Sequence, residues 1–291
     1  MKSKRELAAK EVDLEGRREQ QLRYFSRLPE LIELHISNGR FIQAVGHIGE
    51  LGSGSMLSVA MMDWTIEDEA AAARRHLELA ASFIPRLGEP TLPGGSGPQA
   101  RPLIDLAVEA FGPLQGNGRV AATAHMRDGP FCLLVAAVLT NTLRKHLPLL
   151  SRLAPLIREH NSEDYSSLDA LGLLAAATGD VALRDAFSYR VESYLKEKWL
   201  QSFFHSNMRQ IQALLARDQT ALDTTTEQAA SEFLQRAKDK KTLGQRLGLG
   251  MYSHVEFDLL GVTVGKLARL NGLRFEHDSR AIPLGIITMF E

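Results

Sequence analysis

Apolar positions along most of the chain recur with the spacing of an α-helix, and alternating β-branched runs are nearly absent. Ala, Leu, Arg, Glu and Gln, which favour helices, fill these segments. In the first segment, residues 4–37, Pro29 is expected to divide the helix into two. The sequence Asn-Gly-Arg at 38–40 predicts a stop, and Phe41 begins another apolar pattern.

Three further helices are predicted in the first half of the chain, over residues 65–85, 103–111 and 131–146. Thr65 can cap the first of these, with Asp68 placed to reach back to it. The third is apolar nearly all round and is therefore expected to be buried. It contains Cys132, the single cysteine, whose apolar neighbours predict an inert core thiol.

From residue 168 the pattern is helix, Gly-Asp turn, helix. Gly179 suits the left-handed position after a helix, and Asp180 can cap the next one. A long helix is expected to follow as far as about Ala216, where a similar turn occurs. Such short connections join antiparallel helix pairs. We therefore predict an all-α fold, a multi-helix bundle or a short α-solenoid of antiparallel helical hairpins.

Two glycine-containing stretches interrupt these helices. Residues 88–102 are rich in Gly and Pro and predict a flexible surface loop. Because similar helical patterns lie on both sides, we interpret the loop as an insertion in a single helical domain, residues 1–291. The segment Glu50–Leu57, with two glycines and two serines, is expected to be a turn that caps the next helix; the alternative is a phosphate cradle.

Composition narrows the classes of partner. The 34 Lys and Arg residues nearly balance the 35 Asp and Glu residues, which provides no overall field to attract nucleic acid or an anionic membrane. No apolar run approaches the ~20 residues that a membrane span needs, and no secretory signal precedes the first helix. A lone cysteine fits a reducing compartment. We expect a cytoplasmic protein that binds neither nucleic acid nor membrane.

The densest polar chemistry lies near the C-terminus, where His254, Glu256 and Asp258 begin an apolar pattern. If residues 254–270 form one helix, His254 and Asp258 share a face and Glu256 points elsewhere, so the three do not converge on a metal ion. Apolar residues on both sides of this helix predict that it is buried. A buried Asp258 would need as its partner an Arg or a helix N-terminus from elsewhere in the protein. We interpret these three residues, with Asp278, as a structural polar cluster.

A metal site is the alternative interpretation of the same region. His277 and Asp278 follow the helix-ending Gly272, and in space they could join His254 and Asp258 as a two-His, two-Asp ligand set. The spacing does not require this arrangement, and the chain lacks the known zinc and calcium motifs. We therefore predict no metal, no cofactor and no catalytic residue.

A second polar segment surrounds Tyr165 with carboxylates. Glu163, Asp164 and Asp169 lie close to it in the sequence. A solvated acidic loop explains the segment adequately. The more specific interpretation is a contact site for a basic protein, because an aromatic ring among charged groups is typical of binding hot spots.

The last forty residues combine an apolar helix that carries acidic residues with a short motif series: Glu256, Asp258, Leu267-Ala268-Arg269, Gly272, Asp278-Ser279 and Pro283. In these features they resemble the C-terminal signature of a family of all-helical immunity proteins from bacterial polymorphic toxin systems, the forty-ninth numbered immunity family, or a related helical immunity family. The helix–turn–helix over residues 168–187 resembles the middle region of that family. The resemblance implies a non-enzymatic antidote that binds a cognate toxin domain.

Three functions follow from these observations. The first is an immunity protein that neutralises a polymorphic or contact-delivered bacterial toxin by direct binding. Its long predicted helix is of the kind that often forms homodimers. The second is a helical-repeat scaffold or regulator that binds a peptide. The third is a metal-dependent enzyme that uses His254, Asp258, His277 and Asp278.

Overall fold

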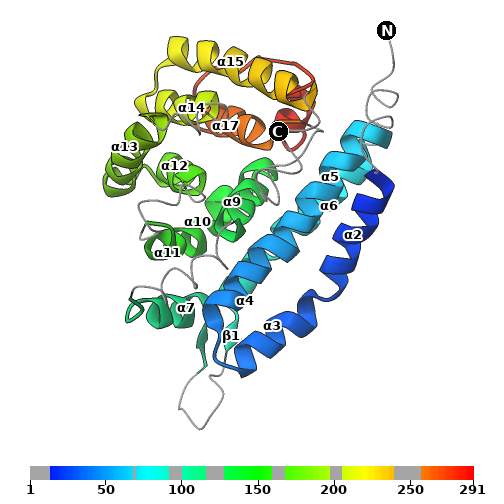
Figure 1. Cartoon of the computed structure of the whole chain (residues 1–291), viewed down its shortest axis with the longest axis vertical. Helices are drawn as coiled ribbons and strands as arrows, with labels where there is room; N and C mark the ends of the chain where they lie inside the picture. The colour runs from blue at the N-terminus through cyan, green and yellow to red at the C-terminus, as the bar shows by residue number, and fades with distance from the viewer. Residues whose placement is uncertain are drawn as a thin grey trace. The chain divides into compact units, whose positions relative to one another are not determined.

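The computed structural model describes residues 14–67, 70–91, 100–115, 128–158, 168–196, 205–238 and 257–291. Over these ranges the protein is all-α apart from one pair of two-residue strands, which confirms the predicted fold class (Figure 1). Residue contacts group the chain into two compact units, Met1–Ser167 and Leu168–Glu291. The single domain inferred from the sequence stays a prediction, because this grouping does not test whether either unit folds alone.

Short helices build the first unit. They are α2 (Leu14–Ser26), α3 (Leu28–Ser37), α4 (Phe41–His47), α5 (Ser55–Met62), α6 (Ala70–Ala81), α7 (Leu103–Phe111), α9 (Gly129–Leu139), α10 (Leu143–Leu150) and α11 (Ala154–Arg158). Its described residues also include two π-helical segments, η1 (Ile48–Gly54) and η2 (Asp63–Glu67), two 3-10 turns, η3 (Ile84–Gly88) and η4 (Ser151–Leu153), and the pair of short strands. The predicted division at Pro29 is confirmed, since Pro29 lies in the first turn of α3.

The chain is helical without a break from α4 through η1 and α5 to η2. Two predictions were therefore wrong. The expected turn at Glu50–Leu57 is π-helix and α-helix, and Thr65 lies inside η2 rather than capping a new helix. Glycines in and beside the predicted turn instead permit close packing. A Cβ on Gly52 would stand 3.0 Å from the ring of Phe83, and one on Gly49, just before the predicted turn, would stand 2.3 Å from the carbonyl oxygen of Gly129 in α9.

Helix α9 is the centre of the first unit. All eleven of its residues are buried, Cys132 among them, as its apolar pattern predicted. It packs against α4, η1, α6 and α10. The predicted helix over 131–146 is two helices, because Asn141 adopts a left-handed φ of 58° and the N–H of Thr142 bonds back to the carbonyl of Ala137.

The Gly/Pro-rich segment has an ordered base. Strand β1 (Pro90–Thr91) pairs antiparallel with β2 (Arg101–Pro102), with Pro90 opposite Pro102. The N–H of Leu103 then bonds to the carbonyl of Glu89, which anchors the start of α7. The loop predicted over 88–102 begins in the last residue of η3, and residues 92–99 lie outside the described part of the chain.

The second unit consists of helical hairpins around one buried helix. Its elements are α12 (Leu168–Thr178), α13 (Val181–Lys196), α14 (His205–Ala216), α15 (Gln219–Lys238), α17 (Leu259–Leu270) and α18 (Leu284–Thr288). Figure 1 shows the two hairpins, α12–α13 and α14–α15, with α17 beside α14. Residues Leu259–Ala268 are all buried, and α17 contacts α12, α14, α15 and α18.

Turn chemistry sets the ends of these helices. Gly179 and Gly272 have φ of 70° and 78°, as predicted, and Arg217 has the same left-handed conformation at 56°. Asp180 accepts the N–H of Leu183 at 3.1 Å, which confirms its capping role. The long helix expected to reach Ala216 is instead two helices, α13 and α14, and the eight residues between them lie outside the described ranges.

Among the residues that the structure describes, no helix is both long and apolar enough to cross a membrane.

Candidate functional site

Asp258 is the residue of the C-terminal polar cluster that the structure describes most fully. It has an extended backbone and stands at the N-cap of α17, so the helix begins at Leu259 and not near residue 254 as predicted. One carboxylate oxygen accepts the N–H of Gly261 at 3.0 Å, and the other accepts the side-chain amide of Asn207 in α14 at 2.7 Å. The partner of this buried carboxylate is its own helix N-terminus and an amide, rather than the Arg or distant helix that we expected.

A buried hydrogen-bonded chain extends from Asp258 into the second hairpin. Asn207 also donates to Gln210 at 3.1 Å, and Gln210 donates to Thr226 of α15 at 3.0 Å. Thr226 in turn donates to the carbonyl of Leu222. These polar groups link α14, α15 and α17 through specific partners, which fixes the packing of three helices around one polar core.

Asp278 and His277 lie apart from this chain in their hydrogen bonding. Asp278 is exposed, and its carboxylate accepts the N–H of Leu284 at 3.0 Å, at the start of α18. His277 lies 3.0 Å from the hydroxyl of Ser279. His254 and Glu256 lie outside the described residues. Among the residues described, no group of three or more His, Cys, Asp or Glu side chains could hold a metal ion.

Of the four residues predicted to form a contact site for a basic protein, the structure describes one. Glu163, Asp164 and Tyr165 lie outside the described ranges. Asp169 is buried in the first turn of α12, with 4% of its surface exposed, and it accepts the N–H of Ala170. Its carboxylate therefore helps to begin α12 and is not presented on a surface, in contrast to the role that we expected from the sequence.

Sequence reasoning missed an ion cluster at the end of α17. Arg269 makes a two-point contact with the side-chain carboxylate of Glu291, at 2.7 and 2.5 Å, and the ammonium of the buried Lys266 lies 3.4 Å from the same group. Burial lowers the pKa of Lys266, while hydrogen bonds from Arg269 lower the pKa of Glu291. The sequence offered one signal for this cluster, the two basic residues Lys266 and Arg269 three positions apart. Their common partner, Glu291, lies 22 residues after Arg269.

A second missed cluster belongs to the first unit. The fully buried carboxylate of Asp63, in η2, lies 3.1 Å from Arg18 of α2 and 2.5 Å from the imidazole of His76 in α6. This arrangement ties three helices together through one acid. Spacing along the sequence gives no signal for it, because the three residues come from separate helices.

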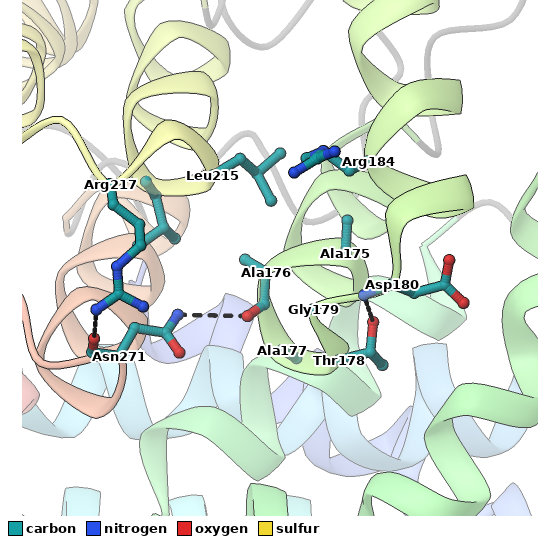
Figure 2. A pocket seen from close by; sticks show the side chains of 11 residues that line it. Ala175, Ala176, Ala177, Thr178, Gly179, Asp180, Arg184, Leu215, Arg217 and Asn271 are labelled. Carbon is teal, nitrogen blue, oxygen red and sulfur yellow. Dashed lines mark hydrogen bonds between the residues drawn. The ribbon is translucent and has the colours of Figure 1, made fainter.

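The second unit contains a cleft of about 310 Å³ where α12, α14 and α17 end. Its floor comes from small residues, chiefly Ala175–Ala177, together with Leu214 and Leu215, and presents both polar and apolar atoms. Three charged residues line it as well: Asp180, Arg184 and Arg217. In Figure 2 the two arginines lie on opposite sides, with Ala176 and Leu215 between them.

The charged groups of the cleft differ in how far the fold uses them. Arg217 donates to the carbonyl of Asn271 at 2.9 Å, and Asn271 donates to the carbonyl of Ala176 at 3.3 Å, so this side braces the ends of three helices (Figure 2). Asp180 caps α13. Arg184 makes an ion pair with its neighbour Asp185 at 3.6 Å, and half of its side chain is exposed. Of the three charged residues that line the cleft, Arg184 therefore contributes least to holding the fold.

No protein family model matches the chain, and neither the curated proteins nor the solved structures include a significant match.

Proposed function

We propose that the protein is a non-enzymatic immunity protein that binds a cognate bacterial toxin domain and neutralises it by direct contact. The motif series in the last forty residues supports this proposal, through its resemblance to helical immunity proteins. In the structure, Leu267 and Ala268 lie in the buried face of α17 and Gly272 ends that helix. These three positions belong to the scaffold, and we place the binding surface on the outer helices.

The observation that carries the proposal is the outer face of α13. Tyr189 is 80% exposed and Val181 is 56% exposed, although both are large hydrophobic side chains. By contrast, the polar side chains of the inner helices are engaged in hydrogen bonds that hold the unit together. An exposed tyrosine on a rigid helix provides the kind of contact that dominates protein–protein binding energy.

The second candidate function is a peptide-binding scaffold, which the cleft beside α12 favours. Its volume of about 310 Å³ would hold a side chain or two of an extended segment. The affinity for the partner distinguishes the antidote function from the scaffold function. A toxin antidote is expected to bind one partner with a Kd on the order of 1 nM or tighter, whereas a peptide scaffold is expected near 1 μM.

The test is co-expression with the product of the gene immediately upstream, followed by affinity capture and size-exclusion chromatography. The proposal predicts a stable stoichiometric complex and rescue of host cells from that product. The elution volume of the chain alone also reports whether it is a homodimer. No complex together with no rescue would contradict the antidote function and favour the scaffold.

A matched pair of variants sharpens this test. Tyr189→Ala is expected to weaken the complex at least tenfold, because it removes an exposed aromatic contact. Tyr24→Ala, which truncates another exposed tyrosine in the first unit, is the control and should bind as the wild type does. Equal binding by both variants would show that α13 is not the contact surface.

A further inference from the structure

We propose that the cleft at the ends of α12, α14 and α17 receives an acidic side chain of a protein partner, and that Arg184 binds its carboxylate. This inference rests on the proposed function, since it names the chemistry by which a toxin domain would be recognised. It commits to a protein source for the carboxylate.

The shape of the cleft suits a side chain with an apolar stem. Alanines 175–177 leave the hollow because their side chains are short, and Leu215 adds an apolar wall (Figure 2). At about 310 Å³ the space lies at the lower end of the range for small-molecule pockets. The methylene groups of a glutamate would contact this floor while its carboxylate reached the rim.

The side chains at the rim carry a net positive charge, which favours an anion. Both basic residues, Arg184 and Arg217, face the space, and the one acidic residue, Asp180, already accepts a hydrogen bond from the N-terminus of α13. Arg217 is held by its bond to Asn271 and therefore contributes a fixed positive field. A carboxylate between the two guanidinium groups would be attracted by both.

Arg184 is placed where the fold has little use for a cation. It lies in the N-terminal part of α13, where the helix dipole disfavours positive charge. Its ion pair with Asp185 joins adjacent residues that are 49% and 70% exposed, and such pairs contribute little to stability. The guanidinium can therefore bind a new partner with little loss of stability. Its two parallel N–H groups match the two oxygens of a carboxylate.

The first experiment uses the full chain and two capped tripeptides, acetyl-Gly-Glu-Gly-amide and acetyl-Gly-Gln-Gly-amide, followed by NMR. The glutamate peptide is expected to shift the amides of Ala176, Arg184 and Asn271 saturably, with a Kd on the order of 1 mM. The glutamine peptide should bind at least tenfold more weakly. Equal responses to the two peptides, or no saturable response, would overturn the inference.

Three variants identify the contact. Arg184→Glu reverses the charge, and Ala176→Leu fills the floor with no change of charge; both should abolish the shifts. Arg209→Glu, on the exposed face of α14 and outside the cleft, is the control and should leave them unchanged. Unaltered binding by Arg184→Glu, with its melting temperature equal to that of the wild type, would overturn the inference.

Capture of the upstream gene product separates this inference from the proposed function. At least tenfold weaker capture by Arg184→Glu, with full capture by Arg209→Glu, supports both. Equal capture by both variants overturns the inference and leaves the antidote function standing. If the wild type binds the glutamate peptide but captures no toxin and gives no rescue, the antidote function fails and the carboxylate site stands.

Discussion

Three aspartates of the second unit act by beginning helices. Asp180 and Asp258 accept backbone N–H groups at the starts of α13 and α17, and Asp278 does so at α18. The capping of Asp180 was predictable because a Gly-Asp pair stood between two apolar patterns. The role of Asp258 was not, since the apolar pattern runs through it and suggested that the helix began earlier.

Removal of the Asp258 carboxylate should destabilise the second unit. Asp258→Ala leaves the amide of Asn207 and the N–H of Gly261 without this acceptor, in a buried site. We expect a loss of about 1–3 kcal/mol in the free energy of unfolding, measured by urea denaturation. Asp278→Ala removes an exposed cap and should cost less, about 0.5–1 kcal/mol. An Asp258→Ala variant that unfolds at the wild-type urea concentration would refute the structural role.

Whole elements were predictable where an apolar pattern and a stop signal coincided. The helix over Leu103–Phe111 has the expected bounds, and the helix-ending residues Gly179 and Gly272 take the expected left-handed conformation. The prediction failed at Glu50–Leu57, because glycine favours turns locally yet Gly52 and Gly54 lie in π-helix here. Gly52 packs against the ring of Phe83 and the neighbouring Gly49 packs against α9, and local patterns reveal neither contact.

The crossing of η1 and α9 provides the test at this scale. A methyl group on Gly49 would stand 2.3 Å from the carbonyl oxygen of Gly129, so the two backbones would have to separate. We expect Gly49→Ala to lower the free energy of unfolding by about 3 kcal/mol. Thermal and urea denaturation, followed by circular dichroism, measure this change in the free energy of unfolding.

Gly112→Ala is the matched control for that substitution. A Cβ at Gly112 would meet its nearest neighbour at 3.6 Å, an ordinary contact, and its φ of −51° suits alanine. We expect a change within about 0.5 kcal/mol. Similar losses in the two variants would mean that helix propensity, and not the close backbone approach, sets the cost.

Across the whole chain, each unit is organised around one helix that is buried on all sides, α9 in the first and α17 in the second. The burial of α9 was predictable from its uniform apolar character, and that of α17 from the apolar residues on both of its sides. The contacts that surround them were not, because the partners of Asp258, Lys266 and Asp63 come from distant parts of the sequence. The cleft likewise depends on three helix ends meeting in space, so only its separate turns could be recognised in the sequence.

The two units should also share a response to acid, because each contains a histidine whose pKa is lowered. Burial lowers the pKa of His146, and the nearby positive charge of Lys145 lowers it further. Burial likewise lowers the pKa of His205, and the charge of Arg209 lowers it further. Between the folded pKa and the unfolded value of 6.5, the unfolded chain binds more protons than the folded chain. Stability should therefore fall as the pH falls from 6.5 through the folded pKa values.

Urea unfolding between about pH 7.5 and about pH 5 measures this slope. The double variant His146→Gln, His205→Gln removes both groups and should give a flatter dependence over that range. A further loss is expected below the ordinary pKa of 4.5, because the pKa of Glu291 is lowered chiefly by hydrogen bonds from Arg269 and its protonation breaks them. Glu291→Gln should remove that acid-side loss and leave the histidine slope in place. A double histidine variant with the wild-type slope above pH 5 would show that other groups set the acid sensitivity of the fold.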